Sequence, residues 1–210
     1  MIELGEHITI FGMTGCGKTT LTRKLAQIFT RRVVFDRLLE WNESSIIIVH
    51  HFTEFARIYR ELYSASSFTI VYRPSTGMPG DALCEETDKI LSLIYQVESH
   101  NSQGIALIFE EVWLYAPVHS IPPWFQEICL TGRHYKISVL ANSQRPAHVS
   151  KTLITQSRHV FIGQFFEMND RKYLEATLGQ LPGLKNPPQP GTFIWFQPKM
   201  GQNTQSVSVF

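Results

Sequence analysis

The sequence has 210 residues, of which 43% are hydrophobic, and this is enough apolar material for the core of a globular domain. Its 19 basic and 18 acidic residues leave a net charge of +1, which excludes a protein that is basic all over and restricts any DNA contact to local patches. No apolar run approaches the roughly eighteen residues that cross a bilayer, and the start lacks the basic and apolar regions of a signal peptide. We therefore expect one cytoplasmic domain over residues 1–210, without a transmembrane segment and with Cys16, Cys84 and Cys129 as free thiols.

Apolar runs alternate with amphipathic stretches along the chain, which is typical of a mostly parallel central sheet flanked by helices. The expected strands cover residues 7–11, 32–36, 45–49, 68–72, 104–111, 137–142, 159–163 and 192–196. The expected helices cover residues 21–29, 53–62, 82–98, 122–134 and 170–178, with a polar loop at 73–81 and a proline-rich turn at 182–190. This order of elements predicts an α/β fold.

The stretch between the first strand and the first helix matches the phosphate-binding pattern G-x-x-x-x-G-K-S/T. Glycines let successive backbone N–H groups turn toward one anion, and the helix that follows directs the positive end of its dipole to the same point. Lys18 adds a positive charge, and the Thr19 hydroxyl is a ligand for Mg²⁺. We expect ATP to be bound by the backbone and side chains of Gly12, Thr14, Gly15, Cys16, Gly17, Lys18, Thr19 and Thr20.

Two acids, Glu110 and Glu111, follow the five-residue apolar run IALIF. In open α/β sheets the ligand lies beyond the carboxyl ends of the strands, so these acids should face the phosphate loop. One would reach the metal and the other would polarise the attacking water, because adjacent side chains on a strand face different ways. Glu110 is our metal-side candidate together with Thr19, although the division of roles between the two acids stays open.

Two further polar residues flank the next strand. Gln144 comes just after it, where it could contact the γ-phosphate or the attacking water. Arg133 precedes the strand, at the end of the helix before it, where it could reach a neighbouring subunit. A solvated or DNA-contacting arginine is the alternative for Arg133.

Taken together, Gly12 to Thr19, the strand that ends in Glu110 and Glu111, and the later Gln144-Arg145-Pro146 resemble the FtsK/HerA superfamily of P-loop ATPases. The resemblance covers about residues 7 to 165. It implies a RecA-like P-loop NTPase fold, Walker B acids at Glu110 and Glu111, a polar sensor at Gln144 and an arginine finger at Arg133. Because the chain has room only for a motor core, it is most similar to the viral genome-packaging branch, such as the packaging ATPases of the turreted icosahedral viruses of Sulfolobus.

The resemblance also implies partners. These are double-stranded DNA bound independently of sequence, further copies of the chain in a hexameric or pentameric ring, and capsid or membrane proteins at the packaging vertex. The place of action would be the host cytoplasm, in association with that vertex. The loop at 73–81 and the segment with Lys151 and Arg158 are candidates for gripping DNA.

Three other functions fit a phosphate loop: another DNA-pumping or secretion ATPase, a small-molecule or nucleotide kinase, and a GTPase-like switch. The paired acids with Gln144 are not the arrangement of such kinases, and the guanine signature N-K-x-D is absent from the sequence. Trp113, Trp124 and Trp195 are expected to be core or interface anchors, while Asp36 is either a turn residue or part of the nucleotide edge.

Overall fold

The computed structural model describes residues 1–210 except 102, 166, 180–186, 188, 199–203 and 210. Its centre is one sheet with the strand order β3-β4-β2-β5-β6-β1-β7-β8-β9. The strands from β3 to β7 run parallel, and β8 and β9 are added antiparallel at one edge. Their bounds are β1 Ile8–Phe11, β2 Arg31–Phe35, β3 Ile47–Val49, β4 Phe68–Tyr72, β5 Ile105–Phe109, β6 Ile137–Ser143, β7 His159–Ile162, β8 Thr192–Phe196 and β9 Thr204–Ser208.

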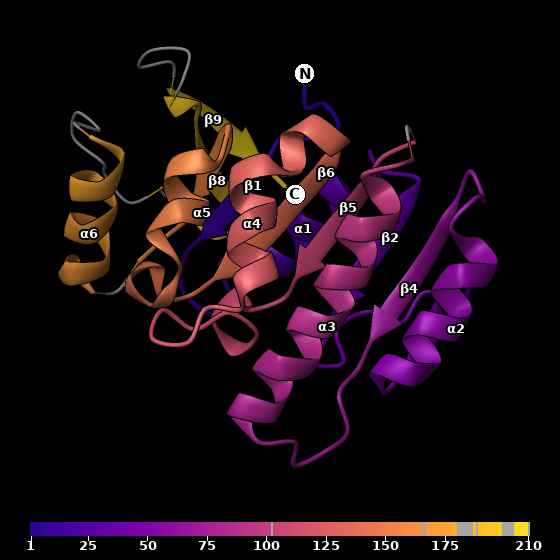
Figure 1. Ribbon diagram of the computed structural model, residues 1–210. Coiled ribbons are helices and arrows are strands. Elements are labelled where there is room, and N and C mark those ends of the chain that lie inside the picture. The colour runs from indigo at the N-terminus through magenta and orange to yellow at the C-terminus, as the bar shows by residue number, and fades with distance from the viewer. Residues whose placement is uncertain (102, 166, 180–186, 188, 199–203, 210) are drawn as a thin grey trace.

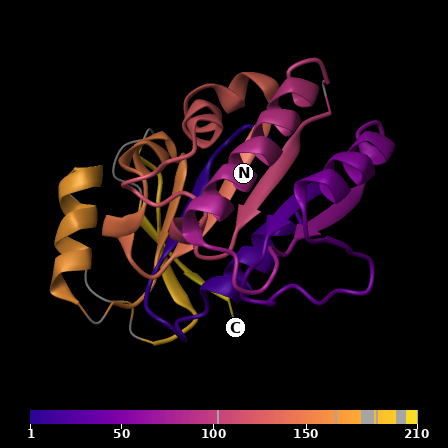
Figure 2. The ribbon, with the colours of Figure 1, turned by 60° about the horizontal axis from the view of Figure 1, so that its bottom comes forward.

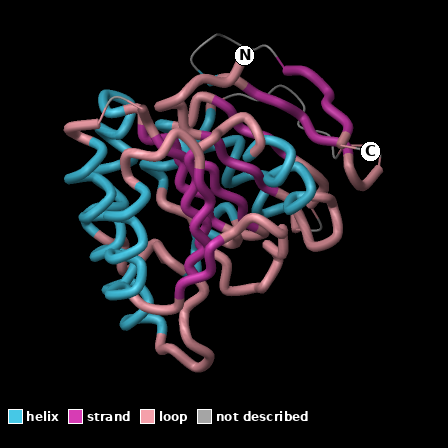
Figure 3. Tube along the Cα trace, turned by 90° about the vertical axis from the view of Figure 1, so that its right-hand side faces the viewer, coloured by secondary structure: helices cyan, strands magenta, loops and turns pink. Residues whose placement is uncertain are grey.

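Helices cover both faces of this sheet. Figures 1 and 2 show α2, α3, α4 and α5 on one face, with α6 beyond α5, and Figure 3 shows helices on both sides of the strands. Helix α1 packs on the other face, where it contacts β1, β5 and β6. The helices are α1 Lys18–Ala26, α2 Phe52–Leu62, α3 Gly80–Glu98, α4 Pro123–Thr131, α5 Lys151–Gln156 and α6 Met168–Leu178, with 3₁₀ turns at Val112–Leu114, Gly132–Tyr135 and Pro146–His148.

The two faces bury separate apolar clusters because successive strand side chains point in opposite directions. Val33 and Phe35 of β2 belong to the larger cluster beneath α2 to α5, while Val34 between them belongs to the cluster beneath α1. The central strands β5 and β6 are buried along their whole length. A sheet covered in this way holds the strand ends, and the loops that leave them, in fixed relative positions.

The α/β class and the mostly parallel sheet are confirmed, and the differences from the sequence expectation are local. Helix α1 begins at Lys18, directly after the left-handed Gly17, and the single helix expected over 122–134 ends at Thr131 and continues as a 3₁₀ turn. Strand β3 is shorter than expected, because it is an edge strand whose Ile47 and Ile48 are exposed. Helix α5 and strand β9 were not expected, and most of the proline-rich turn at 182–190 lies outside the described residues.

Candidate nucleotide site

The phosphate loop connects β1 to α1 and depends on glycine at its ends. Gly12 has a φ of 156° and Gly17 a φ of 97°, values that residues with a Cβ rarely adopt. At Gly12 a Cβ would also lie 2.6 Å from Sγ of Cys16, which is fully buried beneath the loop. Burial raises the pKa of the Cys16 thiol, so this side chain serves as a small apolar support for the loop.

The last residues of the chain cover the back of this loop. Gly191 donates its N–H to the carbonyl of Cys16 at 2.9 Å, and Val209 donates to the carbonyl of Gly191 at 2.8 Å. The ammonium of Lys24 in α1 donates to the carbonyl of Val209 at 2.6 Å. Val209 is buried, and its side chain lies in the space that a Cβ on Gly17 would approach. The β8–β9 hairpin therefore fixes the phosphate loop from behind.

In front of the loop lies an open cavity of about 320 Å³. It is bounded by the phosphate loop, by Leu38 and Glu40 from the segment after β2, and by Glu110, Glu111 and Gln144 from the ends of β5 and β6. The residues that the loop contributes are Thr14, Gly15, Gly17, Lys18, Thr19 and Thr20. Of the expected nucleotide-binding residues, only Gly12 and Cys16 lie behind the cavity wall.

Glu110 is almost completely buried at the inner wall of the cavity. Its Oε2 accepts hydrogen bonds from the Thr19 hydroxyl at 3.4 Å and from the side-chain amide of Asn142, and its Oε1 accepts from the indole N–H of Trp41 at 3.1 Å. Burial raises the pKa of Glu110, while the hydrogen bonds from Asn142 and Trp41 lower it. The acid and the Thr19 hydroxyl thus place two oxygen atoms that could bind a metal ion on one side of the cavity.

Glu111 has a different environment and an uncommon backbone conformation. Its φ of 55° and ψ of 68° lie in the left-handed region, and its N–H donates to Oδ1 of Asn142 at 2.9 Å. Its Oε2 accepts from the indole N–H of Trp113 and from the backbone N–H of Gln144, both at 3.1 Å. Its Oε1 lies 3.8 Å from Nζ of Lys18. The two acids therefore face different parts of the cavity, as expected. The reason differs from the expected strand alternation, because β5 ends at Phe109 rather than at Glu111, and the left-handed turn at Glu111 redirects the chain.

Gln144 also lies in this cavity, where its Oε1 accepts a hydrogen bond from the Thr14 hydroxyl at 2.7 Å. The contact joins the end of β6 directly to the phosphate loop.

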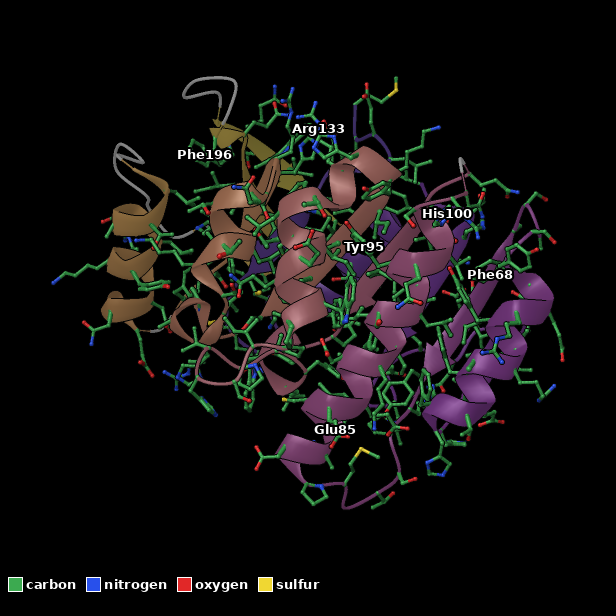
Figure 4. The ribbon with its side chains drawn as sticks, in the orientation of Figure 1. Phe68, Glu85, Tyr95, His100, Arg133 and Phe196 are labelled. Carbon is green, nitrogen blue, oxygen red and sulfur yellow. The ribbon has the colours of Figure 1, made fainter. Side chains whose placement is uncertain are left out.

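Arg133 is the one predicted catalytic residue that the structure does not bring to this cavity. It lies in the 3₁₀ turn before β6, at the edge where the parallel strands begin. Figure 4 shows it at the end of the molecule opposite Glu85, a residue near the start of α3. Arg133 is exposed there and lines a second cavity of about 230 Å³ together with Glu6 and Arg158. Any contact between Arg133 and a bound nucleotide would have to be made in a neighbouring copy of the chain.

Two parts of the site were not expected from the sequence. Asn142 bridges the acids and also donates to the Thr22 hydroxyl at 3.0 Å; its only signal was a polar residue at the end of a buried strand. Trp41 is fully buried, and its position is fixed by Asp36, whose carboxylate accepts a hydrogen bond from the backbone N–H of Trp41 at 3.0 Å and pairs with Arg73 at 3.1 Å. Asp36 thus stabilises the turn that holds Trp41 beside the site, and Arg73 stabilises the same turn through its ion pair with Asp36.

The donors present suit a magnesium ion that is bound jointly with a phosphate group. Among the described residues there is no group of three His, Cys, Asp or Glu side chains that could hold a metal ion alone. Magnesium on a nucleotide needs only one or two protein oxygens besides the phosphates and water, and Thr19 with Glu110 supplies them.

Within the described part of the chain, no helix is long and apolar enough to span a membrane.

Comparison with known proteins supports the fold. No protein-family model matches the sequence, and a search of curated proteins found no match. Among solved structures, the genome packaging NTPase B204 of Sulfolobus turreted icosahedral virus 2 in complex with AMP gives a TM-score of 0.72 at 14% identity and covers 100% of both chains. The same protein with sulfate gives 0.71 at 12% identity over 98% of this chain and 96% of that one. VirB4 of Thermoanaerobacter pseudethanolicus gives 0.69 at 9% identity over 97% and 89%.

These structures are similar over nearly their whole length to the present chain, including the region outside the sequence motifs. The chain therefore has the fold of the genome packaging NTPase B204 and of VirB4, as the resemblance of its motifs implied.

Proposed function

We propose that this protein is an ATP-hydrolysing motor that moves double-stranded DNA and packages a viral genome into a preformed capsid. The observation that carries the proposal is the cavity in which Lys18 and Thr19 meet Glu110 and Glu111. Support for the DNA substrate comes from the fold, which is shared with B204, the DNA-packaging ATPase of Sulfolobus turreted icosahedral virus. B204 of Sulfolobus turreted icosahedral virus 2 has been solved with ATP-gammaS and with AMPPCP, both analogues of ATP.

In the binding step, backbone N–H groups of the loop and the ammonium of Lys18 hold the phosphates of ATP. Thr19 and Glu110 would hold Mg²⁺, which neutralises charge on the β- and γ-phosphates when it is bound. The assignment of Glu110 to the metal side is supported by its contact with Thr19, 3.4 Å away. Thr14, Gly15 and Thr20 complete the wall around the triphosphate.

In the chemical step, Glu111 orients a water molecule for in-line attack on the γ-phosphorus. Its Oε1 faces Lys18, the residue that would touch the γ-phosphate, while its Oε2 is already bound by N–H donors. Gln144 acts as a sensor of the γ-phosphate, because its side chain contacts Thr14 in the phosphate loop.

Arg133 takes part from a neighbouring subunit of a ring. Its exposed position, remote from the cavity of its own chain, fits a finger that is donated in trans. Such an arginine stabilises the charge of the transition state and raises turnover by about a thousandfold or more. We propose a pentameric or hexameric ring in the host cytoplasm, docked on capsid or membrane proteins at the packaging vertex.

The test is phosphate release from ATP with and without duplex DNA, combined with a mass measurement in the presence of a non-hydrolysable ATP analogue. The motor requires release that duplex DNA stimulates and a mass of several subunits. Phosphate transferred to an acceptor molecule, without free phosphate, would identify a kinase instead. Release that DNA leaves unchanged would favour a secretion ATPase instead.

A further inference from the structure

The carboxylate of Glu111 is anchored on one oxygen and open on the other. Both N–H donors, from Trp113 and from the backbone of Gln144, bind Oε2. Within the described residues Oε1 has no such donor, and it lies on the side of Lys18, 3.8 Å from its ammonium. A carboxylate held in this way presents one defined oxygen to the position of the attacking water.

Trp113 is unusual among the four tryptophans because 37% of its surface is exposed, although its indole N–H is engaged inside the site. Its ring lies edge-on to His148 of the 3₁₀ turn after β6, with 6.1 Å between the ring centroids. The indole therefore spans from the acid at the end of β5 to the loop that follows β6. A core anchor would be buried instead, as Trp41 is.

The local backbone explains how Trp113 reaches the acid two residues before it. Glu111 is in the left-handed conformation, which non-glycine residues adopt rarely, and its N–H is held by the buried Asn142. The chain turns there directly into the 3₁₀ turn Val112–Leu114, so that the side chain of residue 113 folds back over the carboxylate. The indole and the backbone turn thus fix the same carboxylate.

We propose that Trp113 is a positioning residue that holds Glu111 in the orientation needed to align the attacking water. The proposal rests on the proposed ATPase function and adds to it a residue outside the sequence motifs. Trp113 is not among the residues that line the cavity, so we expect it to make no contact with the nucleotide. Its loss should therefore slow the chemical step and leave the binding of ATP unchanged.

The test compares Trp113→Phe, which keeps an aromatic ring and lacks the N–H, with the matched control Trp124→Phe. Trp124 packs on Tyr95 between α3 and α4, with centroids 5.2 Å apart, away from the site. In Trp113→Phe, kcat should fall roughly tenfold to a hundredfold, while KM and the affinity for a fluorescent ATP analogue change by less than about twofold. In the control, all three quantities should stay at the wild-type values. An unchanged kcat, or an equal loss of kcat and affinity, would overturn the proposal, since the second result indicates a packing role only.

A second measurement does not depend on activity. Glu111→Gln should shift the tryptophan emission spectrum, because the carboxylate beside the indole is replaced by a neutral amide. The shift should be absent when the same change is made in Trp113→Phe. An identical shift in both backgrounds would show that Trp113 does not contact Glu111 in solution. If the wild type hydrolyses no ATP, the proposed function fails, and the emission comparison still decides whether the indole holds the acid.

Discussion

The hydroxyl of Thr19 lies 3.4 Å from Oε2 of Glu110, and 91 positions in the sequence separate the two residues. The contact joins the start of α1 to the end of β5, and it lies on the side of the site where we propose that magnesium binds. Thr19→Val keeps the shape of the side chain and removes the hydroxyl, so it should raise the Mg²⁺ concentration that ATP binding requires by about tenfold or more. Magnesium titrations with a fluorescent ATP analogue measure this, with Thr155→Val on the exposed part of α5 as the control. An unchanged Mg²⁺ requirement would exclude Thr19 as a ligand.

Glu111→Gln should lower the turnover of ATP by about a hundredfold or more, because the amide cannot accept a proton from the attacking water. Binding of ATP should persist, since the amide oxygen still accepts the hydrogen bonds from Trp113 and Gln144. Steady-state phosphate release and equilibrium binding measure the two quantities. Glu175→Gln, which alters a partly exposed ion pair with Arg171, is the control. Retained turnover in Glu111→Gln would remove this acid from the chemical step.

Arg133→Ala should abolish turnover at protein concentrations that favour assembly, while nucleotide binding remains. A mixing experiment sharpens the test, because in the proposed ring a subunit with Arg133→Ala would keep an intact Glu111 and receive an arginine from its neighbour. Mixtures of Arg133→Ala with Glu111→Gln should therefore regain part of the activity that each lacks alone. Arg57→Ala, on the exposed face of α2, serves as the control. Wild-type turnover in Arg133→Ala would assign this arginine to another role.

Asn142→Ala should lower the free energy of unfolding by about 1–3 kcal/mol, because a buried carboxylate and a buried backbone N–H both lose a partner. The side chain of Asn142 is buried and binds Glu110, Glu111 and Thr22 at once. Urea unfolding measures the change, and Asn101→Ala, whose side chain bonds on the surface, gives the comparison. Equal stability of the two variants would mean that water replaces the hydrogen bonds of Asn142.

The stability of the protein should fall as the pH drops below about 6.5. His159 is buried, with Nε2 at 2.9 Å from Glu6 and Nδ1 accepting the indole N–H of Trp195 at 3.2 Å. Burial lowers the pKa of His159 from the ordinary value of 6.5, although the hydrogen bond to Glu6 acts the other way. As the pH falls, His159 therefore takes up a proton in the unfolded chain before it does so in the folded protein. The free energy of unfolding decreases as the pH falls from about 6.5 to the lower pKa that His159 has in the folded protein.

Urea unfolding at a series of pH values between 7.5 and 5 measures this effect, with roughly a half-unit spacing. The slope of stability against pH should be smaller in His159→Asn than in the wild type. An equal slope in the two proteins would assign the acid sensitivity to other groups.

The phosphate loop and the paired acids could be predicted from the sequence because each is a local pattern at a strand end, and parallel strands bring such ends together. Asn142 could not be assigned in this way. Its role depends on the register of β5 with β6, which places Phe109 beside Ala141 and hence the following residues beside each other. Strand β9 could not be predicted because its sequence TQSVS contains one apolar residue. A segment with so little apolar character forms a strand through its pairing with β8.

The position of Trp41 in the site could not be predicted from the sequence either. It lies in a loop without apolar periodicity, and its place beside Glu110 follows from the ion pair between Asp36 and Arg73, residues at the ends of β2 and β4. Those two strands are neighbours in the sheet, although the intervening β3 and α2 separate them along the chain. Sequence patterns identify what a residue can do, whereas the fold decides which residues it meets.

Gly191 and Val209 support the phosphate loop from behind, next to Cys16 and Gly17, and this has a consequence for synthesis on the ribosome. The loop that would hold ATP is translated before this support, which follows on the order of ten seconds or more later at ordinary elongation rates. A nascent chain with β1 and α1 alone would have an unsupported loop, so competence to bind nucleotide should arise only after Val209 has been added and β8 and β9 have folded. Such a delay would keep nascent chains that lack these strands from trapping ATP.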